Sequence, residues 1–164
     1  MRDPSFIRNF IFGVEDSLVS TVGLLSGVAV AGVAAETIVL TGIILIFVEA
    51  FSMGVGSLLS DHSAREYGSQ HEVPLAKSMS GGLIMFVSYV LAGFIPIASY
   101  LIFNSVSLAF RISITLSLLA LFALGLLIGQ VSGTHRLKEA FQTIVLGGLA
   151  IGLGVFVGQI TSAL

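Results

Sequence analysis

The sequence contains no cysteine and no tryptophan, and only 10% of its 164 residues are charged. Without cysteine it has neither a disulfide framework nor a thiolate metal site, so any bound metal must be held by oxygen, imidazole or thioether groups. It also lacks a basic run of the kind that binds nucleic acid, and a net charge of −2 points to no other partner. These absences exclude the nucleic-acid-binding and disulfide-stapled classes.

Apolar residues dominate what is present. They make up 55% of the chain, and the mean hydropathy of +1.06 exceeds what a soluble domain of this length could hide in one core. They form five runs, each close to the ~20 residues that a helix needs to cross a bilayer, without the alternation of barrel strands. The sequence therefore predicts an all-α integral membrane protein whose residues 1–164 form one domain. The spans are expected at about residues 9–35, 37–60, 75–103, 112–131 and 140–163.

The basic residues predict the orientation of these spans. Six of the seven fall on the side of the N-terminus, and Arg111 falls on the other. Because basic residues gather on the cytoplasmic side, the N-terminus is expected in the cytosol and the C-terminus outside it. The six are Arg2, Arg8, Arg65, Lys77, Arg136 and Lys138.

The second connection, residues 61–76, is the longest and most polar, and would be cytoplasmic. Its first half has no helix breaker before Gly68, so we expect the second span to continue into water and to stop at that glycine. Imidazole and carboxylate groups one turn apart can share a divalent ion, although a solvated helix end explains them equally well. The candidates for metal capture are Asp61, His62, Glu66, His71 and Glu72.

Glycines recur at four-residue spacing in three of the spans. Such spacing lets helix backbones approach closely in lipid, so these glycines are expected to be contact surfaces between helices. They are Gly23 and Gly27, then Gly125, Gly129 and Gly133, then Gly148 with Gly152 and Gly154 with Gly158.

Three carboxylates, Glu15, Asp16 and Glu49, lie inside the spans, and no lysine or arginine lies deep enough to pair with them. An unpaired acid at mid-membrane costs at least ~2.5 kcal/mol, so it normally faces a partner or a water-filled cavity. Two alternatives stand beside a cation or proton path. A purely structural protein would leave the acids without purpose, and an intramembrane enzyme is not expected because no histidine lies within a span.

Helix geometry relates these acids to a methionine. Counted from Arg8 and Asp61, Asp16 and Met53 each lie about 12 Å into the membrane at 1.5 Å per residue. Glu49 lies one turn deeper than Met53 on the same stripe. Glu15 lies about 100° around the helix from Asp16 and is expected to face another subunit or headgroup water. Carboxylate and thioether together favour Fe²⁺ or Mn²⁺ over Ca²⁺ or Mg²⁺.

The segments "RNFIFGVEDSLVSTVGLLSGVA" and "EAFSMGVGSLLSDHSAREY" resemble the vacuolar iron transporter family of divalent-metal transporters. The resemblance implies a homodimer of five-helix subunits with a metal path between the two first spans. It implies export of Fe²⁺ or Mn²⁺ from the cytosol in exchange for protons, with no cofactor, in a cell or organelle membrane. The family's transport-site aspartate falls on Asp16 and its methionine on Met53.

The chain departs from the family pattern at several positions. Ser17 stands where a glycine usually follows the aspartate, and Glu15 adds an acid beside it. Glu49 occupies a position that is generally small in the family, so its role is not inherited. The plant members carry a glutamate-rich metal-binding domain between the second and third spans, and this chain has only a short loop there. A passive cation channel remains the alternative to proton exchange.

Overall fold

The computed structural model describes residues 4–163, and all of its regular structure in that range is helical. This confirms the predicted all-α class. The elements are α1 (Pro4–Val30), α2 (Ala35–Ser69), the short 3₁₀ helix η1 (Leu75–Lys77), α3 (Met79–Ile102), α4 (Val106–Ser132) and α5 (Arg136–Ser162).

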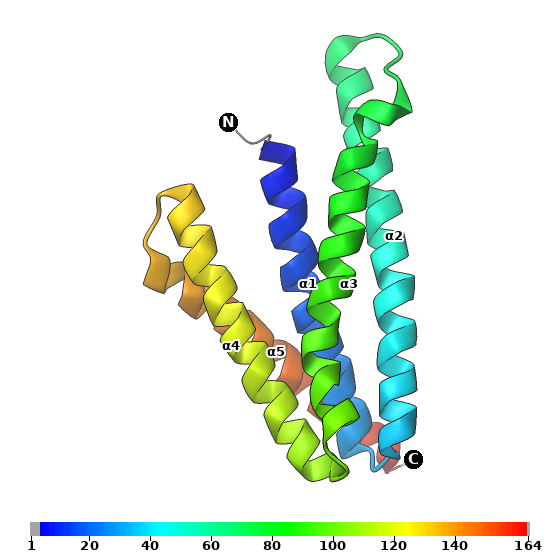
Figure 1. The fold of residues 1–164 in the computed structure, drawn as a ribbon, viewed down its shortest axis with the longest axis vertical. Helices are drawn as coiled ribbons and strands as arrows, with labels where there is room; N and C mark the ends of the chain where they lie inside the picture. Colours follow the sequence, from blue (N-terminus) through cyan, green and yellow to red (C-terminus); the bar gives the residue numbers. More distant parts are fainter. Residues whose placement is uncertain (1–3, 164) are drawn as a thin grey trace.

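The helices run up and down along one long axis (Figure 1). The N-terminus, the α2–α3 connection and the α4–α5 connection lie at one end, and the other connections and the C-terminus lie at the opposite end. Helix α1 packs along both α3 and α5, while α2 packs along α3 and α4 along α5. The turn of the α4–α5 hairpin leans away from α1 at the end of the bundle that carries the N-terminus (Figure 1).

All five long helices are long and apolar enough to cross a membrane. Large apolar side chains cover the outside of the bundle, for example Phe51, Leu91 and Leu149, each about two-thirds exposed. An apolar surface this extensive is unstable in water and suits contact with lipid chains. The protein is a multi-pass integral membrane protein.

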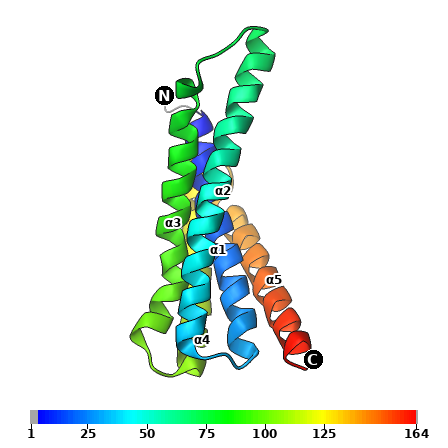
Figure 2. The same ribbon diagram turned by 90° about the vertical axis from the view of Figure 1, so that its right-hand side faces the viewer.

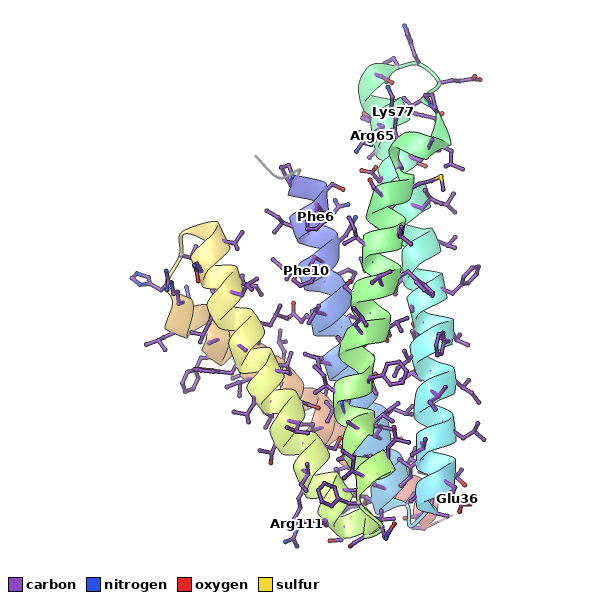
Figure 3. The ribbon with its side chains drawn as sticks, in the orientation of Figure 1. Phe6, Phe10, Glu36, Arg65, Lys77 and Arg111 are labelled. Carbon is purple, nitrogen blue, oxygen red and sulfur yellow. The ribbon has the colours of Figure 1, made fainter. Side chains whose placement is uncertain are left out.

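The described basic residues also follow the predicted division between the two ends. Arg65 and Lys77 lie at the end that carries the N-terminus, whereas Arg111 lies at the opposite end with Glu36 (Figure 3). Arg136 begins α5 at the same end as Arg65. Arg2 belongs to the same prediction but lies outside the described residues.

Several helix ends differ from the predicted span boundaries. The fourth helix begins at Val106 rather than residue 112, with the Ser105 hydroxyl accepting a hydrogen bond from the Leu108 amide at 3.5 Å. The fifth begins at Arg136 rather than residue 140, and residues 75–77 of the third predicted span form η1 before α3 begins. Hydropathy marks the part of a helix that suits lipid, whereas capping and polar turns decide where the helix begins.

Helix α2 extends beyond its apolar part, as predicted, but it does not stop at Gly68. It continues to Ser69, and Gln70 takes the left-handed conformation with φ 57°, its amide donating to the Glu66 carbonyl at 2.8 Å. A glycine inside an exposed helix costs only about 1 kcal/mol, which the neighbouring helical residues can offset. The stop predicted at Gly68 was therefore placed too early.

Some of the expected glycine contacts are present within the chain. A Cβ on Gly27 would lie 2.6 Å from the Gly154 carbonyl oxygen, and Gly158 meets Gly27 in turn, so α1 and α5 touch backbone to backbone. Gly125 and Gly129 similarly face the start of α5. Gly23 likewise faces Ala150 of α5, whereas a Cβ on Gly133, Gly148 or Gly152 would meet no atom of residues 4–163 within 4 Å. Gly133 instead ends α4 with φ 69°, a conformation that glycine adopts without strain.

Candidate functional site

The centre of the site joins α1, α2 and α3. Asp16 on α1 lies close enough to Glu49 on α2 for their charges to interact. The charges of both carboxylates also interact with the Tyr89 phenol of α3. Asp16 and Glu49 are half-buried, whereas Tyr89 is fully buried. Two acids separated by more than thirty positions in the sequence therefore lie within electrostatic range of each other and of Tyr89.

Hydroxyl groups fix Tyr89 in this region. The Tyr89 hydroxyl and the Ser20 hydroxyl share a hydrogen bond of 2.7 Å, and the Ser17 hydroxyl donates to the Tyr89 carbonyl at 2.6 Å. Gly93, one turn after Tyr89, leaves room for the Ser17 side chain, since a Cβ there would lie 2.9 Å from its oxygen. The serines of α1 thus hold α3 in register beside Asp16.

Met53 lies in a different cavity from Asp16. A cavity of about 650 Å³ between α1 and α2 is lined by Glu15, Met53 and Met85, among others. Asp16 and Ser20 instead line a cavity of about 510 Å³ between α1 and α5. The depth argument had placed Asp16 level with Met53, and the rotation of about 100° per residue explains why the neighbouring Glu15 reaches the methionine's cavity.

None of the ion pairs among the described residues includes Glu15, Asp16 or Glu49. They join Arg65 to Asp61 and His62 to Glu66, both in the extension of α2. Glu15, Asp16 and Glu49 therefore have no basic partner within residues 4–163. Such acids can hold a cation or a proton.

Comparison with known proteins identifies the family. The model of the VIT family matches residues 7–73 and 65–159, which together cover almost the whole chain. The chain belongs to the VIT family. This confirms the resemblance that the first two spans indicated.

Named relatives of this VIT-family chain are transporters from plants. Vacuolar iron transporter 1 of Arabidopsis thaliana is 31% identical over 74 residues, which are 45% of this chain and 30% of that protein. Vacuolar iron transporter 2 of Oryza sativa subsp. japonica is 33% identical over 85 residues, 52% of this chain and 34% of that protein. Vacuolar iron transporter homolog 5 of the same plant is 24% identical over 165 residues, covering 94% of this chain and 78% of its own length. The chain thus spans about a third of the first two relatives.

The predicted capture residues of the VIT-family chain lie in the polar end of α2 and in the connection that follows it. Asp61 accepts a hydrogen bond from Arg65 at 2.7 Å, and His62 lies 3.4 Å from Glu66. His71 and Glu72 are exposed, and the His71 ring is bonded to the Gln70 carbonyl. No three histidine or acidic side chains of the described part of the chain gather closely enough to hold a metal ion together. Metal capture by this loop therefore stays a prediction.

Tyr89, Ser17 and Ser20 were not predicted as part of the site. Ser17 attracted notice only as a departure from the family pattern, and Tyr89 not at all. The available signal was the run of hydroxyl residues at positions 17, 20 and 21, which puts polar groups on one face of an otherwise apolar helix. Their partner on α3 could not be named from sequence, because nothing local specifies which face of α3 meets α1.

Proposed function

We propose that this protein transports divalent transition-metal cations, Fe²⁺ and Mn²⁺, across a membrane. The observation that carries the proposal is a pair of half-buried acids, Asp16 on α1 and Glu49 on α2, which lie within electrostatic range of each other and form no ion pair with a basic residue in the described spans. The membership of the VIT family and the printed names of its relatives support a metal ion as the substrate. These residues bind and pass an ion rather than catalyse a reaction.

The ligand chemistry supports transition metals as the class of substrate. Asp16, Glu49 and Glu15 supply oxygen atoms, which bind most divalent ions, and Met53 supplies a thioether sulfur. Ca²⁺ and Mg²⁺ prefer oxygen ligands alone, whereas softer ligands such as a thioether favour transition-metal ions. A path that contains both therefore favours Fe²⁺ and Mn²⁺ over the two hard cations.

Exchange with protons is part of the proposal. Asp16 and Glu49 repel each other when both are ionised, and either a bound cation or a proton removes that repulsion. A carboxylate pair that alternates between the two occupants exchanges one for the other. The buried Tyr89 hydroxyl shares a hydrogen bond with Ser20, so hydroxyl groups lie within electrostatic range of the pair.

We further propose that the end with Arg65 and Lys77 is cytoplasmic, so that the C-terminus lies on the far side and metal leaves the cytosol. The basic residues at that end support this orientation. The protein is proposed to act as a homodimer, with the metal path between the two α1 helices. The cavity that Asp16 lines along α1 and α5 is where a second subunit would contribute.

Metal uptake into proteoliposomes tests the proposal. Vesicles with an internal metal-sensitive dye receive Fe²⁺, Mn²⁺ or Ca²⁺ outside, with and without a pH gradient, for the wild type, Asp16→Asn and Glu49→Gln. Glu36→Gln is the matched control, because Glu36 is an exposed carboxylate at the opposite end of α2. We expect gradient-dependent Fe²⁺ and Mn²⁺ flux that Asp16→Asn abolishes and Glu36→Gln leaves unchanged.

The same assay separates the alternatives. Flux that ignores the gradient would identify a passive channel and refute proton exchange. No flux of any ion from folded wild-type protein would refute transport altogether. Glu49→Gln is expected to flatten the dependence on pH more than it lowers the amount of folded protein, and an unchanged pH series would remove Glu49 from the mechanism.

A further inference from the structure

The α4–α5 hairpin leaves a cleft beside α1 at the end of the bundle that carries the N-terminus. Helices α1 and α5 touch farther along, where Gly27 meets Gly154, and they diverge from there toward this end (Figure 1). Two cavities lie in the opening, of about 710 Å³ and about 350 Å³, and Ile11 of α1 lines both. Together they form one cleft between α1 and the hairpin, which we call the hairpin cleft.

The walls of the hairpin cleft are mostly aromatic and aliphatic. They include Phe10 of α1, Leu127 and Val131 of α4, and Phe141, Val145 and Leu146 of α5. Water inside such walls would find few polar partners, whereas an acyl chain is compatible with them. Each cavity also has a volume within the ~300–1,000 Å³ that is usual for pockets binding small apolar ligands. The walls therefore suit the hydrocarbon part of a lipid.

The polar groups of α5 in this cleft follow a definite order along the helix. Lys138 and Gln142 lie one turn apart on the stripe of α5 that lines the larger cavity, and Val145 and Leu146 continue the same stripe. The stripe thus changes from a charged group near the start of α5 to apolar groups deeper in the bundle. A phospholipid has its phosphate and its chains in the same order, with the phosphate at the membrane surface.

The charge at this end favours an anionic headgroup. Lys138 and Arg136 are exposed, and neither forms an ion pair among the described residues. The neighbouring Glu139 accepts a hydrogen bond from the Thr134 hydroxyl at 3.1 Å, which holds its carboxylate toward the turn. Glu15 lies on the opposite wall, and it also lines the cavity between α1 and α2. Basic groups between helices at the cytoplasmic side of a membrane bind the headgroups of anionic lipids.

We propose that the hairpin cleft binds an anionic phospholipid, with its phosphate on Lys138 and Gln142 and its acyl chains between α1 and the α4–α5 hairpin. The Lys138 ammonium and the Gln142 amide each donate a hydrogen bond to a phosphate oxygen. The lipid fills the opening and keeps the hairpin apart from α1. Anionic lipids are concentrated in the cytoplasmic leaflet, which agrees with the orientation proposed above, and the binding itself does not depend on transport.

Quenching of a single tryptophan by brominated lipids tests this site, because the chain has no tryptophan of its own. Phe141→Trp places the reporter in the hairpin cleft. Leu83→Trp is the matched control: Leu83 is about as exposed as Phe141, and it lines a cavity between α1 and α3 whose lining residues among those described carry no charge.

Each full-length variant is reconstituted without metal into vesicles of phosphatidylcholine that contain one brominated lipid. The brominated lipids are phosphatidylglycerol, phosphatidylethanolamine and phosphatidylcholine. The ratio of quenching by each lipid to quenching by brominated phosphatidylcholine gives a relative association constant at that position, so differences in depth between the two reporters cancel.

We expect phosphatidylglycerol to be favoured about fivefold over phosphatidylcholine at position 141, the effect of about one basic side chain, and not to be favoured at position 83. Lys138→Gln in the Phe141→Trp chain is expected to abolish the preference, and it changes an exposed side chain that the packing does not need. Lys77→Gln removes a basic residue of η1 at the same end and is expected to leave the preference unchanged.

Four results would overturn the proposal. Equal preferences at positions 141 and 83 would show a general attraction of anionic lipid to this end of the protein. A preference that survives Lys138→Gln would remove the lysine from the site, and phosphatidylethanolamine binding as well as phosphatidylglycerol would show that the net charge of the headgroup is not recognised. Weak quenching by every lipid at position 141 would mean that protein, such as a second copy of the chain, covers the cleft. Each result holds whether or not the protein transports metal.

Discussion

Replacing Gly27 with alanine is expected to destabilise the bundle, because α1 and α5 meet there backbone to backbone. The new Cβ would lie 2.6 Å from the Gly154 carbonyl oxygen, whereas ordinary contact begins at 3.4 Å, so the helices must separate locally by about 0.8 Å. The obstructing atom belongs to the main chain, and no side-chain rotation relieves the clash. The whole contact around Gly27 has to open.

The size of the effect follows from that separation. A gap of about 0.5–1 Å forfeits a quarter to a half of the dispersion energy of the contacts across it. Overpacking of this kind costs about 1–3 kcal/mol, while the better helix propensity of alanine returns about 0.5–1 kcal/mol. We therefore expect the free energy of unfolding to fall by about 1–2 kcal/mol, or roughly five- to thirtyfold in the ratio of folded to unfolded protein.

Pulse proteolysis across a titration with sodium dodecyl sulfate measures the change, since the chain has no tryptophan to report unfolding. Gly152→Ala is the matched control on α5: a Cβ there meets no atom within 4 Å, so only the propensity gain applies. We expect the midpoint to fall for Gly27→Ala and to stay or rise for Gly152→Ala. Equal midpoints for the two variants would refute the assignment of Gly27 to a tight helix contact.

Three other substitutions test single interactions. Tyr89→Phe removes the hydroxyl bonded to Ser20. We expect slower metal uptake in the vesicle assay and a loss of about 0.5–1.5 kcal/mol in the free energy of unfolding. Unchanged uptake would confine Tyr89 to a structural role. Thr143→Val removes a buried donor to the Leu121 carbonyl, at 2.8 Å, which should lower the free energy of unfolding by about 1 kcal/mol in the proteolysis assay. Arg65→Ala breaks a partly exposed ion pair, and its midpoint should stay within about 0.5 kcal/mol of wild type; a larger shift would mean that the pair holds the α2 extension in place.

The candidate site was only partly visible in the sequence. Asp16, Glu49 and Glu15 stood out because acids are costly in lipid, whatever surrounds them. Their grouping did not stand out. A depth estimate along two ideal helices put Asp16 level with Met53, which stays a prediction, and it could not show that Glu15 lines the cavity with Met53 or that Asp16 lies within electrostatic range of Glu49 and Tyr89. Depth is a one-dimensional measure, and the facing of two helices depends on their rotation about their own axes.

The glycines give a second example of the same limit. Spacing alone marked four sets of glycines as contact surfaces, and it could not tell that Gly27 meets Gly154 while a Cβ on Gly152 would meet no described atom within 4 Å. A glycine on a helix face permits close approach without specifying the partner.

By itself the sequence determined that the chain lies in a membrane as five helices, because the transfer of apolar residues into lipid and the satisfaction of backbone polar groups are local properties of each segment. It also singled out the carboxylates whose burial in a membrane span is energetically unfavourable, and which therefore need a partner, a cation or a proton. Only the tertiary structure decided which helices touch, that Ser17 and Ser20 hold Tyr89, and which carboxylate meets which neighbour. Those facts depend on how side chains from distant segments interlock, and helix packing in lipid is set by that interlocking rather than by hydropathy.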